Sequence, residues 1–206
     1  MATVDYKLIK NFFSKEEILF LQNYCNRKLD TDKDYVIDHQ SFSPAFDTDE
    51  VMFSFLDIKK SKVEEESNLK LFPTYAYWRY YIFGGSLKFH RDRPACEVSV
   101  TVCLKKHDKW PLVIENESVE LEEGDGLLYA GCVQLHGRPG IYKGEGMAQA
   151  FFHYVDQSGP FTAHTYDRFR LSHLPASVYE SPEDLTIKKN LIKEYKKEKK
   201  NYGKNR

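Results

Sequence analysis

Residues 81–92, with the sequence YIFGGSLKFHRD, form the stretch that decides the fold we expect. The Gly84-Gly85 pair predicts a turn between two short extended segments. The second segment ends in His90-Arg91-Asp92, which places an imidazole and a carboxylate two residues apart. Because successive side chains of a β-strand point to opposite faces, those of His90 and Asp92 should share one face. The spacing therefore predicts two neighbouring candidate metal ligands on a strand.

The sequence around this stretch alternates with a period of two from Pro73 onward. Short turns rich in Gly, Asp or Pro separate most of the alternating segments. The predicted strands are residues 74–83, 87–92, 97–104, 112–114, 118–121, 127–130, 133–138 and 147–155. About eight short strands of this kind are typical of a β-sandwich or a closed barrel.

The N-terminal third predicts helices instead. Ser14 and Glu17 have the spacing of a capping box, which predicts a helix of about three turns. A second helix is predicted from apolar residues at helical spacing, with acidic residues at its N-terminus. These apolar residues are Met52, Phe55, Leu56 and Val63. Residues 30–48, between the two helices, are expected to form a polar loop. The fold class expected is therefore mainly β with flanking helices.

Charge divides the chain into two parts. The 206 residues carry a formal net charge of −1, yet residues 188–206 hold nine basic and two acidic side chains. The remaining 21 basic and 29 acidic residues give residues 1–187 a net charge of −8. We expect one domain over residues 1–182, with a helical lead-in over 1–70 and a β core over about 74–156, and a basic tail over 183–206. The tail is either a solvated helix or an arm that binds nucleic acid or another partner.

Several classes of protein are excluded or disfavoured. No stretch approaches the roughly 20 apolar residues that span a membrane, and the N-terminus lacks a secretory signal pattern. The four cysteines form no CxxC pair, which favours reduced thiols and a cytoplasmic location. The acidic body disfavours a nucleic-acid substrate, although the tail leaves nucleic-acid binding open.

A third metal ligand can come from His136, at the end of another predicted strand. Two histidines and one carboxylate form a facial triad that leaves coordination positions open on ferrous iron. The alternatives are a structural His–Asp contact with an unrelated histidine, and a cupin-like barrel that binds metal without oxidising a substrate. The other five histidines are expected at the surface, except His153, which is expected in the core.

The motif Y-x-x-G-x-x-L-x-x-H-x-D at residues 81–92, with EGDGLLY at 123–129 before His136, resembles the iron(II)- and 2-oxoglutarate-dependent dioxygenases, in their prolyl 4-hydroxylase-like branch. The segment KLIKNFFSKEEILFLQNYC also resembles the lead-in helix of that branch, and the resemblance covers about residues 5–160. It implies a double-stranded β-helix (jelly-roll) core, and iron held by His90, Asp92 and His136. It also implies oxidative decarboxylation of 2-oxoglutarate with dioxygen; ascorbate is a further candidate cofactor.

The binding site for the remote carboxylate of 2-oxoglutarate departs from the resembled pattern. The branch places a Lys or Arg about ten residues after the distal histidine, where this chain has Gly146. Small residues there would leave room for a cation from elsewhere. Arg138 is the first candidate, because it lies two residues beyond His136, and Arg79 is the second; Lys143 and Lys105 are weaker. Tyr81 is the candidate hydroxyl partner of the carboxylate.

Substrate contacts are expected from Arg93 and Glu97, which directly follow the predicted metal pair, although these two could instead pair with each other. The function expected is hydroxylation of a prolyl residue in a peptide or protein. A free amino acid or other small molecule is the alternative substrate, and a non-enzymatic metal-binding barrel is the second alternative. Residues 30–48 and 156–182 are long enough to border a peptide groove or to form a lid over a small molecule.

Overall fold

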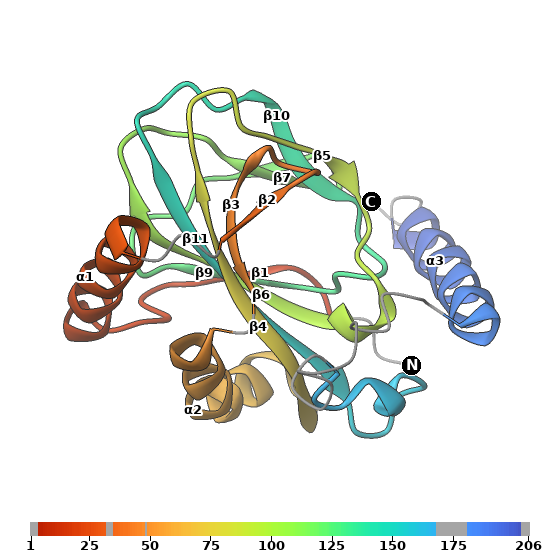
Figure 1. Ribbon diagram of the computed structural model, residues 1–206. Helices are drawn as coiled ribbons and strands as arrows, with labels where there is room; N and C mark the ends of the chain where they lie inside the picture. Colours follow the sequence, from red (N-terminus) through yellow and green to blue (C-terminus); the bar gives the residue numbers. More distant parts are fainter. Residues whose placement is uncertain (1–3, 32–34, 48, 168–180, 203–206) are drawn as a thin grey trace.

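The computed structural model describes residues 4–31, 35–47, 49–167 and 181–202, and within them two antiparallel sheets face each other (Figure 1). The larger sheet has the order β1 (Lys7–Ile9), β9 (Gly126–Tyr129), β6 (Val98–Lys106), β11 (Met147–Asp156), β4 (Leu71–Tyr81), β3 (Ser43–Asp47) and β2 (Val36–Asp38). The smaller sheet has the order β5 (Ser86–His90), β10 (His136–Ile141), β7 (Leu112–Ile114) and β8 (Glu117–Val119). This arrangement is a jelly roll with flanking helices, as the resemblance to the dioxygenases implies.

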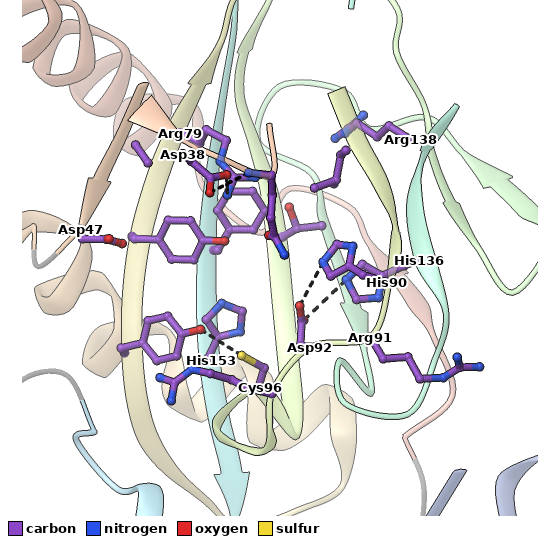
Figure 2. A pocket seen from close by; sticks show the side chains of 18 of the residues that line it. Asp38, Asp47, Arg79, His90, Arg91, Asp92, Cys96, His136, Arg138 and His153 are labelled. Atoms are coloured by element: carbon purple, nitrogen blue, oxygen red, sulfur yellow. Dashed lines mark hydrogen bonds and ion pairs between the residues drawn. The ribbon is translucent and has the colours of Figure 1, made fainter. Parts of the chain in front are cut away.

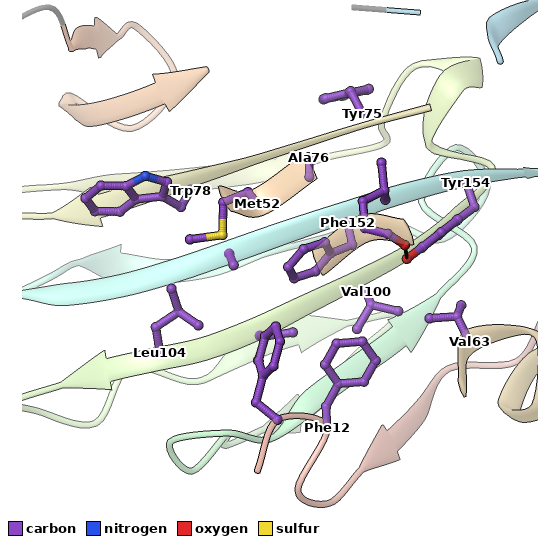
Figure 3. Close-up of a cluster of buried hydrophobic side chains, with 14 of the residues drawn as sticks. Phe12, Met52, Val63, Tyr75, Ala76, Trp78, Val100, Leu104, Phe152 and Tyr154 are labelled. Carbon is purple, nitrogen blue, oxygen red and sulfur yellow. Dashed lines mark hydrogen bonds between the residues drawn. The ribbon is translucent and has the colours of Figure 1, made fainter. Parts of the chain in front are cut away.

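Two helices cover the outer face of the larger sheet, α1 (Lys15–Thr31) and α2 (Glu50–Ser67) (Figure 1). The predicted capping box precedes α1, since the Glu17 N–H donates to Ser14 Oγ and the Ser14 N–H donates to Glu17 Oε2. The Asp49 carboxylate caps α2 by accepting the N–H groups of Val51 and Met52. Figure 3 shows the core between the helices and the sheet, which includes Phe12, Met52, Trp78 and Phe152.

The two faces of β11 point into different parts of the molecule. Ala148, Ala150 and Phe152 belong to the core against the helices, whereas Met147 belongs to the cluster between the two sheets. Side chains at odd positions therefore face the smaller sheet, and side chains at even positions face the helices.

Residues 30–48 do not form the predicted polar loop. Strands β2 and β3 form a hairpin within this segment, and β3 pairs with β4 at the edge of the larger sheet. The side chains of β2 are mostly exposed, so its sequence lacks the apolar alternation of a half-buried strand. Strand β1, at the opposite edge of the same sheet, was also not predicted from the sequence.

The predicted strands otherwise agree with observed ones to within a few residues at each end. The largest shift concerns residues 133–138, because β10 begins at His136 and continues to Ile141. Similarly, β5 ends at His90, so Asp92 follows the strand. Two short 3-10 turns, η1 (Pro94–Cys96) and η2 (Thr162–His164), follow β5 and β11.

The basic C-terminal segment forms helix α3 (Pro182–Tyr202). Leu191 and Tyr195 of α3 are buried in a cluster with Cys132 and Val133, so this helix packs on the jelly roll. Residues 168–180 of the predicted 156–182 loop and residues 203–206 of the tail lie outside the described residues. No helix in the described part of the chain is long and apolar enough to cross a membrane.

Candidate metal centre

The pairing of β5 with β10 brings two histidines together. His90, the last residue of β5, is the direct register partner of His136, the first residue of β10. The Asp92 carboxylate faces both rings from one side: its Oδ1 is 3.3 Å from His90 Nε2, and its Oδ2 is 3.5 Å from His136 Nε2 (Figure 2). Each of the three side chains thus directs a potential ligand atom to a common point, and these atoms lie within 4.8 Å of one another.

Backbone carbonyl groups orient both imidazoles. His90 Nδ1 lies 2.8 Å from the carbonyl oxygen of Lys88, and His136 Nδ1 lies 3.0 Å from that of Gln134. Since a carbonyl oxygen can only accept, each Nδ1 carries the proton and donates it there. Each Nε2 therefore faces Asp92 and, when it carries no proton, can bind a metal.

The Asp92 carboxylate is held ready to act as an anionic ligand. Its backbone N–H donates to the carbonyl oxygen of Gly131 at 2.9 Å, which fixes the turn after β5. Burial by itself would raise the pKa of Asp92, but the imidazoles of His136 and His90 outweigh burial and hold that pKa well below its ordinary value. The carboxylate is therefore ionised throughout the neutral range.

The three side chains fit a divalent transition metal such as ferrous iron. Asp92 Oδ2 is buried and accepts no hydrogen bond within the described structure, which is costly for an anionic oxygen unless a cation binds it. Two imidazole nitrogens and one carboxylate are the donor set of the facial triad, which leaves open positions on octahedral iron.

A cavity of about 690 Å³ opens beside the triad, and all three ligand residues line it. Figure 2 shows Arg79 and Arg138 in this cavity, beyond the triad and approaching from opposite sides. Their guanidinium carbons lie 5.4 Å and 5.9 Å from the centre of the Tyr81 ring. All three residues that were predicted to bind the co-substrate therefore line one cavity.

Arg79, on β4, has a carboxylate partner. Its Nη2 lies 2.6 Å from Asp38 Oδ2, and its Nη1 donates to the Tyr81 hydroxyl at 3.0 Å. Burial opposes the charge of Arg79, but nearby tyrosines and Asp38 outweigh burial and raise its pKa above the ordinary value. The positive charge of Arg79 is thus already neutralised within the protein.

Arg138, on β10, is buried without such a partner. Its Nη1 donates to the carbonyl oxygen of Trp110, and its Nε has no hydrogen-bond partner in the described structure. No carboxylate among the described residues forms an ion pair with Arg138, and burial lowers the pKa of its guanidinium. A buried cation in this state would be stabilised by an anion in the cavity.

Gly146 occupies the position where the resembled branch has a Lys or Arg, and this position faces away from the cavity. A Cβ on Gly146 would overlap the ring of Tyr80, and Ala148 and Ala150 contact the helix layer. The expectation that these small residues leave room for another cation is therefore wrong, because the inward-facing residues of β11 include Gln149 and Phe151. Neither Lys105 nor Lys143 lines the cavity.

The two predicted substrate contacts lie in different surroundings. Arg93 lines the cavity, pairs with Asp167, and places its guanidinium 4.7 Å from the centre of the Tyr75 ring. Glu97 is absent from the cavity lining, and its carboxylate accepts the N–H of Asp156 at 2.8 Å. Burial raises the pKa of Glu97 to about 7. A substrate contact by Glu97 remains a prediction without support from this geometry.

Asp38 and His153 are among the cavity residues that the sequence did not place at the site. Asp38, the partner of Arg79, lies in the hairpin that was expected to be a loop. His153 was expected in the core; it is buried there, 2.8 Å from Ser99 Oγ, but it also lines the cavity. The spacing of two residues from Phe151 to His153 could have indicated one common inward face, had the direction of that face been known.

Comparison with known proteins gives matches at the level of structure. No protein-family model and no curated protein sequence matches the chain. The alpha-ketoglutarate-dependent epimerase SnoN from nogalamycin biosynthesis superposes with a TM-score of 0.65 at 11% identity, over 84% of this chain and 86% of that one. The chain has the fold of the 2-oxoglutarate-dependent oxygenases.

Two further structures share this oxygenase fold. HygX from Streptomyces hygroscopicus, with nickel, 2-oxoglutarate and hygromycin B bound, has a TM-score of 0.60 at 13% identity, over 76% of this chain and 84% of that one. A prolyl hydroxylase from Trichoplax adhaerens, in complex with a peptide fragment of hypoxia inducible factor, has a TM-score of 0.56 at 16% identity, over 75% and 85% of the two chains. At these identities the similarity concerns the fold.

Proposed function

We propose that this protein is an iron(II)- and 2-oxoglutarate-dependent dioxygenase that hydroxylates an unactivated C–H bond. The observation that carries the proposal is one cavity that is lined both by the His90–Asp92–His136 triad and by the buried cation Arg138. Ferrous iron bound by the triad would supply oxidative chemistry that no amino-acid side chain supplies, with 2-oxoglutarate and dioxygen as co-substrates.

The residues of the triad bind the metal and limit its coordination. His90 and His136 present their Nε2 atoms, since their Nδ1 atoms are held by carbonyl groups. Asp92 stays ionised because the imidazoles lower its pKa. Three protein ligands leave coordination positions for a bidentate co-substrate and dioxygen.

Arg138 binds the remote carboxylate of 2-oxoglutarate in this proposal. Arg79 is already neutralised by Asp38, whereas no described carboxylate neutralises Arg138, so Arg138 gains more from a dianionic ligand. The Tyr81 hydroxyl accepts a hydrogen bond from Arg79, which leaves its own proton to donate to the same carboxylate. Together these groups would orient the co-substrate toward the triad.

The substrate we propose is a prolyl residue of a peptide or protein. The hairpin of β2 and β3 borders the cavity, and Val36 and Ile37 expose apolar side chains there, which suits an extended peptide. The Trichoplax adhaerens hydroxylase of the same fold holds a peptide. HygX of the same fold holds hygromycin B, and the cavity volume is also suited to a small molecule, so a small-molecule substrate is the second candidate.

The test is release of succinate from 2-oxoglutarate, with iron(II) supplied, over a panel of proline-containing peptides, free amino acids and methylated oligonucleotides. We expect turnover with a peptide and its loss in His90→Ala and Asp92→Ala. His107→Ala is the matched control, because His107 is exposed and lies outside the cavity. Continued turnover by both ligand variants would refute the triad, and turnover with free amino acids alone would favour the small-molecule substrate.

A further inference from the structure

Helix α3 packs against the turn that leads to the ligand His136. Leu191 and Tyr195 of α3 are buried against Cys132 and Val133, which lie between β9 and β10. Figure 1 shows α3 on the opposite side of the molecule from α1. The turn is also tied to the other ligands, because the Asp92 N–H donates to the Gly131 carbonyl and Arg91 Nε donates to the Val133 carbonyl at 2.6 Å.

Gln134 holds this turn together from within. It is fully buried, and its Oε1 accepts the N–H of Ala130 at 2.8 Å while its backbone N–H donates to the Ala130 carbonyl. The other side of its amide, Nε2, donates to the hydroxyl of Tyr195 at 3.1 Å. The side-chain amide of Gln134 therefore has a fixed orientation, set by the turn at one end and by α3 at the other.

The same residue orients the metal ligand. The backbone carbonyl of Gln134 accepts the hydrogen bond from His136 Nδ1 that leaves Nε2 facing Asp92. A continuous path of hydrogen bonds thus runs from the Tyr195 hydroxyl through Gln134 to the imidazole of His136. Hydrogen-bond partners behind a metal ligand commonly tune the affinity for the metal.

We propose that Tyr195 is a positioning residue for His136, acting through Gln134, and that α3 is consequently a part of the metal site. This inference rests on the proposed function, since it requires that the triad binds a metal. Removing the Tyr195 hydroxyl leaves a buried amide N–H without its acceptor, which favours a different orientation of Gln134. The turn would then hold the carbonyl that orients His136 less firmly, and the protein would bind metal more weakly.

The experiment is a titration of the full-length protein with Co²⁺, followed by the visible absorption of the bound ion. Tyr195→Phe should weaken Co²⁺ binding several-fold, less than the roughly 10–100-fold typical of a direct partner of a ligand. Tyr154→Phe is the matched control: Tyr154 is also buried and donates to a helix, through the Leu56 carbonyl of α2 at 2.8 Å. Both variants should lower the melting temperature, and only Tyr195→Phe should weaken Co²⁺ binding.

A double-mutant cycle tests the route through Gln134. In a Gln134→Met background, Tyr195→Phe should cause no further loss of Co²⁺ affinity. Unchanged affinity in Tyr195→Phe, an equal loss in Tyr154→Phe, or fully additive losses in the cycle would each overturn the inference. If the wild-type protein binds no Co²⁺, the proposed metal site itself is wrong, and the inference is wrong with it. If the wild-type protein binds Co²⁺ and any of the three results above is found, only the inference is overturned.

Discussion

The two groups of charged residues in the cavity are assembled by different parts of the fold. The triad comes from one pair of adjacent strands, because His90 and His136 are register partners and Asp92 follows directly. The arginines come from different sheets, Arg79 from β4 in the larger sheet and Arg138 from β10 in the smaller. The triad therefore depends on the spacing between two backbones, and the arginine group depends on how the two sheets face each other.

This difference predicts that a backbone change between β5 and β10 has the largest effect on metal-dependent turnover. A Cβ at Gly137 would lie 2.8 Å from the Cα of Phe89, so Gly137→Ala should push the two strands apart next to both histidines. We expect metal-dependent turnover to fall by about 100-fold, as for a misplacement of about 1 Å. Succinate release and Co²⁺ titration measure the effect.

The control for this prediction is Gly140→Asn on the same strand. Nothing lies within 4 Å of a Cβ at Gly140, and asparagine tolerates its φ of +67°. This variant should retain turnover. Comparable losses in both glycine variants would show that β10 is sensitive as a whole and that the spacing at Gly137 has no special role.

The second prediction separates the two arginines. Arg138→Met should raise the KM for 2-oxoglutarate by roughly 10–100-fold, since a charge-assisted hydrogen bond contributes about 1.5–3 kcal/mol. Arg79→Met should have a smaller effect on that KM, because Asp38 already neutralises Arg79. Steady-state kinetics with 2-oxoglutarate as the varied substrate decide between them, and a larger effect in Arg79→Met would transfer the role to Arg79.

A third, smaller effect is expected from the hydroxyl between the arginines. Tyr81→Phe should raise the KM for 2-oxoglutarate by about 3–10-fold, the range of a neutral hydrogen bond of about 0.5–1.5 kcal/mol. Its ring, which lies near both guanidinium groups, is retained. Tyr142→Phe is a suitable control, since its hydroxyl donates to the Gly146 carbonyl and Tyr142 is not in the cavity lining. Equal kinetic effects in both variants would argue against a direct contact by Tyr81.

The last prediction concerns Glu97, which lies outside both the triad and the arginine group. We expect its substitution to change stability alone. Burial raises the pKa of Glu97 from 4.5 to about 7, so the folded protein retains a proton that the unfolded chain loses. The contribution of this group to stability is complete below pH 4.5 and is lost as the pH rises to 7. Glu97→Gln should remove this loss, which makes the variant more stable than wild type at pH 8 by on the order of 2 kcal/mol.

Urea denaturation of both proteins at several pH values between 4 and 8 measures this difference. The variant should match wild type in succinate release, because Glu97 does not line the cavity. A constant stability difference across the whole pH range would mean that Glu97 does not titrate in this window, and a loss of turnover would support the predicted substrate contact.

The sequence predicted the pair of His90 and Asp92 because these two residues are close in the chain, whereas the pairing of β5 with β10 brings His136 to them. A spacing of two residues places His90 beside Asp92 even though Asp92 lies just beyond the end of β5. The turns and alternating segments also predicted the strands that carry His136 and Arg138, and the capping box predicted the start of α1. Each of these features depends on residues close together in the chain.

Only the tertiary structure decided which face of β11 meets the cavity. Nine of its ten residues are buried, because helices cover one face and the smaller sheet covers the other. A strand that is buried on both faces has no contrast between apolar and polar positions, so its direction cannot be read from the sequence. For that reason Gly146 was compared with an inward-facing cation, although its neighbour Met147 faces inward.

The roles of the edge strand β2 and of helix α3 could also not be read from the sequence. The reason is the opposite of that for β11, because these two elements are largely exposed. The residues of β2 are mostly exposed, and α3 is rich in lysine with a short apolar stripe, so each sequence resembles that of a solvated segment. Their roles come from single long-range contacts, Asp38 with Arg79 and Tyr195 with Gln134. The sequence therefore determined the ligands of the proposed metal, and the packing of distant segments decided which side chains surround them.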